Sequence, residues 1–292
     1  MHVYSIHWLL AGGIVIVLAC SSISYKWWPK VIGHHFFWKN GKSLSTNSPF
    51  DGFNITKPEP AMGKLYDKLS EDYRIKEGLK ACINCGTCTA ICPAAEFYRY
   101  DPRRIVDIVQ SKDDSQIEQL LKSEAIWYCG ECMSCLTRCP RKNAPGLVIM
   151  ALRSLSIELG YFTHSEKGRQ QYALTRIMTE NILNYGYCVY ARTFKAADHP
   201  EAGPVWKWIE QNMDAVYARN GANLDGEGPG ALRKIPQEDL QQLKKIFDHT
   251  GATRRIDTVY RCSMEKAREM NLTPDEYFHH VFNNSEKDHL NQ

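Results

Sequence analysis

The chain has 292 residues, of which 43% are hydrophobic and 24% charged, so it can bury a sizeable core in one large domain or two modest ones. Its 36 basic and 33 acidic side chains give a net charge of +3, which is too close to neutral for a dedicated nucleic-acid-binding protein. The eleven cysteines are too sparse for a small disulfide scaffold, and eight of them lie in two tight groups. This grouping favours metal binding over disulfide bonds.

The N-terminal segment from Val3 to Tyr25 contains no Asp, Glu, Lys or Arg. As a helix its 23 residues would measure about 34 Å, enough to cross a hydrocarbon core of about 30 Å. Lysines follow this segment, and no charged side chain precedes it. The lack of positive charge before it disfavours a cleaved signal peptide. By the positive-inside rule, the lysines after it place the rest of the chain in the cytoplasm. The sequence therefore predicts a single-pass anchor in the inner (cytoplasmic) membrane at residues 1–25 and a juxtamembrane linker at residues 26–60.

Helix signals recur through the rest of the chain. They are first-turn prolines at Pro102 and Pro236, capping boxes at Ser115–Glu118 and Thr273–Glu276, an apolar stripe from Leu147 to Leu159, and a helical pattern from Glu166 to Tyr190. No long alternating stretch indicates a strand. We therefore predict a mainly α protein, with a cysteine-rich domain at residues 61–162 and a helical C-terminal extension at residues 163–292.

Two runs of cysteines obey the same spacing, Cys-x2-Cys-x2-Cys-x3-Cys-Pro, which is typical of [4Fe-4S] clusters. They are Cys82, Cys85, Cys88 and Cys92, and Cys129, Cys132, Cys135 and Cys139. Three thiolates at such intervals wrap one face of a cubane, and the fourth reaches the other cluster in two-cluster proteins. We therefore predict two clusters with exchanged fourth ligands: the first held by Cys82, Cys85, Cys88 and Cys139, the second by Cys129, Cys132, Cys135 and Cys92. Zinc is the weaker alternative, because zinc sites usually take two cysteines from each of two separate knuckles.

Residues 78–162 resemble the C subunit of heterodisulfide reductase and its bacterial relatives. The residues that carry the likeness are Cys82-Ile-Asn-Cys-Gly-Thr-Cys, Tyr100-Asp-Pro-Arg-Arg-Ile, Ile126-Trp-Tyr-Cys129, and the stretch from Cys139-Pro-Arg-Lys to Ala151-Leu-Arg. The resemblance implies an α-helical ferredoxin fold and an electron conduit that is not catalytic alone. It also implies a separate partner with CCG domains, because this chain contains no Cys-Cys-Gly sequence.

The N-terminal anchor and the C-terminal extension depart from the small soluble members of that family. Both favour a membrane complex in which the two clusters relay electrons between a CCG-domain or flavoprotein subunit and a redox partner or quinone pool. The iron–sulfur subunit of succinate dehydrogenase or fumarate reductase is a competing interpretation, but residues 21–81 contain no cysteine for its [2Fe–2S] centre. A membrane tether with purely structural clusters is a further alternative.

Three cysteines lie outside the two motifs, and we interpret them as bystanders. Cys20 follows a lipobox-like Val17-Leu18-Ala19, but the charge order of the segment favours a residue inside a membrane helix. Cys188 is expected to be a buried thiol in an apolar, helical setting. Cys262 lies near several arginines without a visible base, so a nucleophilic role is disfavoured. No flavin, dinucleotide or metalloprotease motif is present, and no catalytic residue is predicted.

Overall fold

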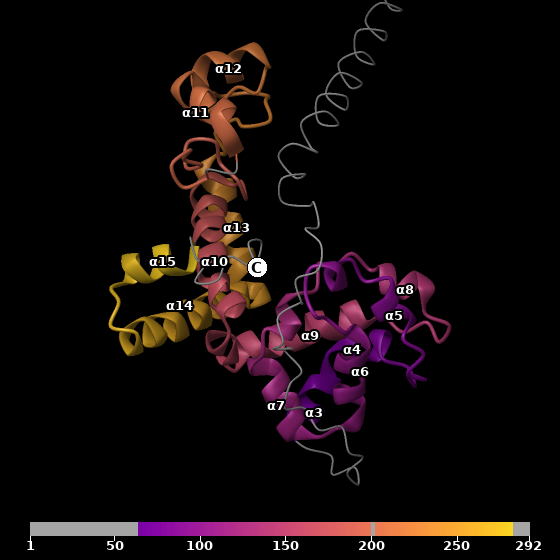
Figure 1. Ribbon diagram of the computed structural model, residues 1–292. Coiled ribbons are helices and arrows are strands. Elements are labelled where there is room, and N and C mark those ends of the chain that lie inside the picture. Colours follow the sequence, from indigo (N-terminus) through magenta and orange to yellow (C-terminus); the bar gives the residue numbers. More distant parts are fainter. Residues whose placement is uncertain (1–63, 200–201, 283–292) are drawn as a thin grey trace, which may run out of the picture. The chain divides into compact units, whose positions relative to one another are not determined.

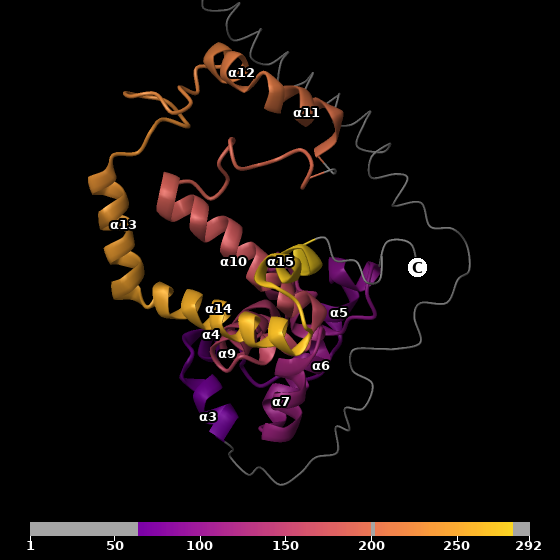
Figure 2. The ribbon, with the colours of Figure 1, turned by 90° about the vertical axis from the view of Figure 1, so that its left-hand side faces the viewer.

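The computed structural model describes residues 64–199 and 202–282, and every element within these ranges is helical. Figures 1 and 2 show these helices, and by their contacts the described residues all belong to one unit. The predicted anchor and linker lie outside the described residues. Among the helices that are described, none is both long and apolar enough to cross a bilayer. The prediction of a mainly α protein is confirmed for this part of the chain.

The cysteine-rich part is built from short helices whose starts are set by aspartate caps and first-turn prolines. Its elements are α3 (Lys64–Glu71), α4 (Tyr73–Gly78), α5 (Thr87–Ala90), η1 (Pro93–Glu96), α6 (Pro102–Ser111), α7 (Asp114–Lys122), η2 (Ala125–Trp127), α8 (Ser134–Arg138) and α9 (Pro145–Glu158). The Asp101 carboxylate accepts from the Arg104 backbone N–H at the start of α6. Such a cap contributes about 1 kcal/mol by satisfying an otherwise unpaired donor.

Helix α9 is the element around which this part packs, and it contacts α4, α6 and α7. The core between these helices contains Ile105, Ile108, Leu120 and Leu152, each fully buried. Full burial stabilises each such side chain by roughly 1.5–3 kcal/mol relative to exposure. The core therefore holds the helices in place, and it leaves the cysteine loops to be positioned by the ends of those helices.

The C-terminal part contains η3 (Tyr161–His164), α10 (Glu166–Tyr185), α11 (Gly203–Gln211), α12 (Met213–Arg219), α13 (Gln237–Thr250), α14 (Ala252–Glu269) and α15 (Pro274–Phe282). Helix α10 packs against α14 and α15 over a second core that includes Phe162, Tyr172 and Tyr277. The predicted capping box of α15 is present: the Glu276 carboxylate accepts from the Thr273 backbone N–H at 2.8 Å. This core is rich in tyrosine and is separate from that around α9.

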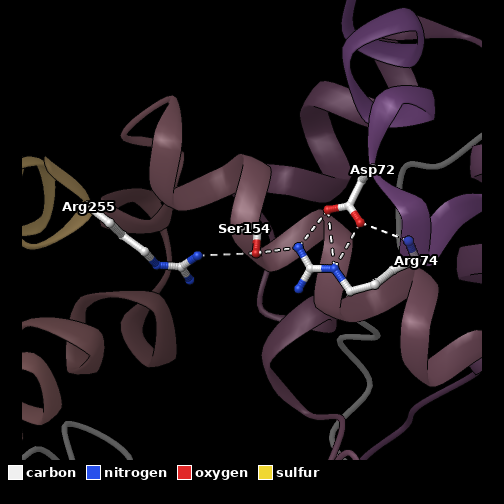
Figure 3. Close-up of polar contacts among 4 residues, drawn as sticks. All are labelled: Asp72, Arg74, Ser154 and Arg255. Carbon is white, nitrogen blue, oxygen red and sulfur yellow. Dashed lines mark hydrogen bonds and ion pairs between the residues drawn. The ribbon is translucent and has the colours of Figure 1, made fainter. Parts of the chain in front are cut away.

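A polar contact joins helices α4, α9 and α14 (Figure 3). The Arg74 guanidinium pairs with Asp72 at 2.6 Å and donates to the Ser154 hydroxyl at 2.8 Å. Arg255 on α14 donates to the same hydroxyl at 3.2 Å. Nearby, the Glu124 carboxylate accepts the first backbone N–H groups of α10, which suits the positive end of a helix. The extension is thus tied to the cysteine-rich part by polar contacts and by helix packing.

Three local predictions differ from the structure. Helix α7 is capped by Asp113, whose carboxylate accepts from two backbone N–H groups, so the capping box predicted at Ser115 is wrong. Helix α10 ends at Tyr185 because Gly186 adopts a φ of 81°, the left-handed conformation that terminates helices. Cys188 consequently lies in a bend and is exposed, which corrects the prediction of a buried helical thiol.

Candidate metal centre

The eight motif cysteines lie in two loops that each lead into a short helix, α5 or α8. In each run the first two cysteines precede the helix, the third lies within it and the fourth follows within two residues of its end. Helices α5 and α8 contact each other, so the two loops are neighbours (Figure 1). The structure therefore brings two segments that are 47 residues apart in sequence into one local site.

The two loops have the same backbone conformation. Asn84 and Glu131 occupy corresponding positions and adopt φ values of 58° and 54°. Gly86 and Met133 also correspond, with φ values of 79° and 57° immediately before the short helix. Left-handed conformations at non-glycine residues cost free energy, and they are kept where the surrounding structure requires them. Here they turn the chain so that consecutive thiols face the same side.

The thiols also receive matching polar contacts in the two loops. The backbone N–H groups of Asn84 and Glu131 donate to the first sulfur of each run, Cys82 Sγ and Cys129 Sγ, both at 3.4 Å. A hydroxyl lies 3.4 Å from the second sulfur in each case, from Thr87 beside Cys85 and from Ser134 beside Cys132. The backbone N–H groups stabilise a sulfur that carries negative charge, which is the state required of a metal ligand, and each hydroxyl can donate in the same way once the thiol beside it has lost its proton.

Each of the two predicted thiol sets lines a cavity of its own. The first, of about 20 Å³, is lined by Cys82, Cys85, Cys88 and Cys139. The second, of about 280 Å³, is lined by Cys92, Cys129, Cys132 and Cys135 and extends beneath aromatic side chains. Cys88 lines both cavities, so the two are adjacent. Each fourth cysteine thus lies at the cavity of the other motif. Within the described ranges, no three His, Cys, Asp or Glu side chains meet as they would around a single ion.

The pKa values of the thiols divide by exposure. Burial raises the pKa of Cys82, Cys92 and Cys129, and it raises the pKa of Cys88 to about 11. The exposed thiols behave oppositely: the hydroxyls of Thr87 and Ser134 lower the pKa of Cys85 and Cys132. Buried thiolates are unfavourable unless positive charge lies close by, and iron would supply that charge. The half-buried thiols therefore suit metal ligands better than free nucleophiles.

Besides Arg103 Nε at the first cavity, two buried polar atoms near these cavities have no hydrogen-bond partner among the described residues. The Tyr100 hydroxyl is one, and Tyr100 lines the second cavity. The Asn143 Nδ2 is the other, and Asn143 lines the first cavity while its Oδ1 accepts from the Lys80 backbone N–H. Buried polar groups are normally paired, so these two donors fit a site completed by cluster and ligand sulfurs. The residues present thus fit two iron–sulfur clusters.

Arg153 on α9 braces the second loop, a role that the sequence did not predict. Its guanidinium donates to the carbonyl oxygens of Ile126 and Cys129, both at 2.6 Å, and to the Glu131 carboxylate at 2.5 Å. It also lies 5.5 Å from the centre of the Trp127 ring. The sequence feature that could have indicated this role is a single arginine inside the apolar stripe of α9, between the buried residues Leu152 and Leu155. A charged residue there requires partners.

The remaining described cysteines lie apart from both cavities. Cys262 is buried in the second core, where burial raises its pKa. The arginines nearby in sequence therefore do not activate it, in agreement with its interpretation as a bystander. Cys188 is exposed and lines neither cavity. Cys20 lies outside the described residues.

Comparisons with known proteins agree with this geometry. Residues 77–143 match the family model of a 4Fe-4S dicluster domain. The chain is similar to the iron-sulfur C 2 subunit of the CoB–CoM heterodisulfide reductase of Methanocaldococcus jannaschii, with 34% identity over 63% of this chain and 78% of that protein. It is similar to the C subunit of the H(2):CoB-CoM heterodisulfide,ferredoxin reductase of Methanothermobacter thermautotrophicus, with 30% identity over 65% of this chain and 85% of that protein. The C subunit of the ferredoxin:CoB-CoM heterodisulfide reductase of Methanosarcina acetivorans is 49% identical over 35% of this chain, although the match spans only 40% of that relative.

Proposed function

The chain belongs to the family of heterodisulfide reductase C subunits, as an iron–sulfur subunit with two [4Fe-4S] clusters, and from this premise we propose that it relays electrons within a membrane-bound oxidoreductase complex. Reversible one-electron reduction is the chemistry that such clusters supply when bound. The observation that supports a relay most strongly is the adjacency of the two thiol-lined cavities, which share Cys88. A purely structural role would need only one of them.

We assign the ligands as the two thiol sets that line the cavities. The first set is Cys82, Cys85, Cys88 and Cys139, and the second is Cys129, Cys132, Cys135 and Cys92. Matching backbone and hydroxyl contacts to the first two sulfurs of each run support the assignment. Cys85 and Cys132 are the exposed members, so each set reaches the surface at one thiol. A redox partner can approach either set there, as an electron conduit requires.

The proposed context is a complex attached to the inner (cytoplasmic) membrane. Residues 1–25 would form the single-pass anchor and residues 26–60 the linker, with the dicluster domain (61–162) and helical extension (163–292) in the cytoplasm. The proposed partners are a catalytic subunit with CCG domains, a flavoprotein subunit, and a quinone reached through a partner. The absence of Cys-Cys-Gly in this chain and the family membership support the first of these.

Iron analysis combined with a reductive titration tests the electron-transfer role. The protein purified in detergent should contain about eight iron atoms per chain and show two centres that dithionite bleaches reversibly. Cys85→Ser and Cys132→Ser should each alter the spectrum of a different centre. Cys188→Ser is the matched control, because Cys188 is equally exposed but lines neither cavity. Two centres that resist reduction until the protein unfolds would contradict an electron conduit.

Membrane fractionation tests the anchor separately. The full-length protein should stay with the membranes through high-salt and carbonate washes, and Ile16→Lys should release it, since a charge at the centre of a span is costly. Ile16→Leu should behave as the unchanged protein. Native mass spectrometry of the detergent extract should reveal the attached subunits. A protein recovered in the soluble fraction at low salt would contradict the anchor and leave the cluster assignment intact.

A further inference from the structure

We propose that the Tyr100 hydroxyl donates a hydrogen bond to Cys129 Sγ and thereby raises the reduction potential of the second cluster without affecting the first. The inference rests on the proposed function, since it requires the two thiol sets to hold clusters. It assigns to Tyr100 one difference between two sites whose first two sulfurs receive the same contacts.

Tyr100 is fixed in place by the helices around it. It immediately precedes Asp101, the residue that caps α6, and it is 4% exposed. Its ring packs edge-on against Tyr128, with centroids 6.1 Å apart. The side chain lines the second cavity together with Cys92 and Cys129. A ring so enclosed cannot turn its hydroxyl towards solvent.

The hydroxyl faces the sulfur of the second set. It makes no hydrogen bond of normal geometry to any described residue, although it is fully buried. Tyr100 lines the second cavity together with Cys92 and Cys129, and a phenol holds its proton at neutral pH, so the hydroxyl is available as a donor there. Of these neighbours, Cys129 is the one that the hydroxyl approaches as a hydrogen-bond partner. A ligand thiolate at this position completes the pairing of a donor that is otherwise unsatisfied.

The effect is confined to one site because Tyr100 lines only one of the cavities. The first two sulfurs of both sets receive equivalent backbone and hydroxyl contacts, so these contacts do not distinguish the sites. The first cavity has no tyrosine in its lining. A hydrogen bond to a ligand sulfur stabilises the reduced, more negative state and raises the potential. This hydrogen bond should therefore raise the reduction potential of the second cluster and not that of the first.

Tyr100→Phe in the detergent-purified full chain, with its subunits attached, tests the inference by a redox titration followed with electron paramagnetic resonance. Removing the hydroxyl should change the reduced-to-oxidised ratio of one centre about tenfold at a fixed potential, a shift of about 59 mV to lower potential for a one-electron couple. The other centre should not move. Cys85→Ser and Cys132→Ser identify which signal belongs to which set. Tyr98→Phe is the matched control, since Tyr98 lines the same cavity but stacks on Tyr128 and is only half-buried.

A second variant keeps the test sharp if Tyr100→Phe loses iron. Site-specific replacement of Tyr100 by 3-fluorotyrosine keeps the ring and strengthens the donor, so the same centre should shift to higher potential. If neither variant shifts a centre, or if both centres shift equally, the inference is overturned and the electron-transfer role stands. If the unmodified protein holds no reducible clusters, the inference and the proposed function fall together.

Discussion

Replacing Arg153 by leucine should empty the second cluster site and leave the first one filled. Arg153 is the contact between helix α9 and the loop that carries Cys129 and Glu131. Its guanidinium is 17% exposed and bonds two carbonyl oxygens, of Ile126 and Cys129, besides the carboxylate. Leucine fills a similar part of the space and removes every donor. The loop would then lose its attachment to the rigid helix.

The magnitude follows from the groups left unpaired. Each carbonyl that loses its charged donor costs about 1–3 kcal/mol, so two of them cost roughly 2–6 kcal/mol. The ion pair with Glu131 adds at most about 1 kcal/mol, because that carboxylate is 40% exposed. The total loss, roughly 2–7 kcal/mol, reaches only the lower end of the stability of a typical domain, about 5–15 kcal/mol. Because the lost contacts all lie at one loop, we expect that loop to open locally while the helices stay folded.

Iron content, circular dichroism and electron paramagnetic resonance together measure the outcome. The Arg153→Leu protein should keep its helical signal, fall from about eight iron atoms towards about four, and lose one of two resonance signals. Arg138→Leu is the matched control, because Arg138 lies in the same motif but is exposed. Retention of both clusters with unchanged stability in Arg153→Leu would refute the reasoning. Loss of both signals at once would show that the loop is not braced independently.

Three further changes test the packing outside the clusters by chemical or thermal denaturation. Gly160→Ala should lower the free energy of unfolding by roughly 1–3 kcal/mol, because the Gly160 φ is 76° and a Cβ there would lie 3.0 Å from Cys262 Sγ. Adding Cys262→Ala removes the contact but not the backbone strain, so it should restore only part of the loss. Full restoration would contradict the backbone cause. Ser156→Ala should lower the free energy of unfolding by about 1–2 kcal/mol, because the fully buried Ser156 hydroxyl donates to the Leu121 carbonyl at 2.8 Å. An unchanged unfolding midpoint would argue against that hydrogen bond. Burial, followed by two nearby lysines, lowers the pKa of His164, so folding disfavours its protonated form and stability should fall as the pH drops below about 6.5. His164→Gln should flatten that part of the pH profile, and an unchanged profile would reject the assignment.

Local signals in the sequence predicted local features of the structure well. The first three cysteines of each run line one cavity, because two-residue intervals impose a turn that depends on local geometry alone. The place of each fourth cysteine at the other motif's cavity depends on contacts between distant segments, and the ligand sets themselves stay a prediction. The capping box at Thr273 is confirmed because all its partners lie within one turn. The error at Ser115 arose where a second cap, Asp113, competed for the same N–H groups.

Contacts between distant segments were not predictable from one sequence. Arg153 bonds the Cys129 carbonyl from 24 residues away, and Tyr100 meets Cys129 across the fold. The sequence around Arg153 or Tyr100 does not indicate which residue either one contacts, because those contacts depend on how α6 and α9 pack. Cys188 shows the converse: its apolar neighbours suggested burial, but Gly186 ends the helix and exposes the thiol. Tertiary packing decided these cases.

The proposed exchange of the fourth cysteines would constrain how the protein matures. Cys139 lies at the cavity of the first motif and Cys92 at that of the second, so neither thiol set is complete until both loops have folded against each other. Iron delivered to one loop alone would find three thiols and an open coordination position. An empty chain should therefore acquire its first cluster only after both loops have met, and loss of a fourth cysteine, Cys92 or Cys139, should weaken the cluster that the other motif mainly holds.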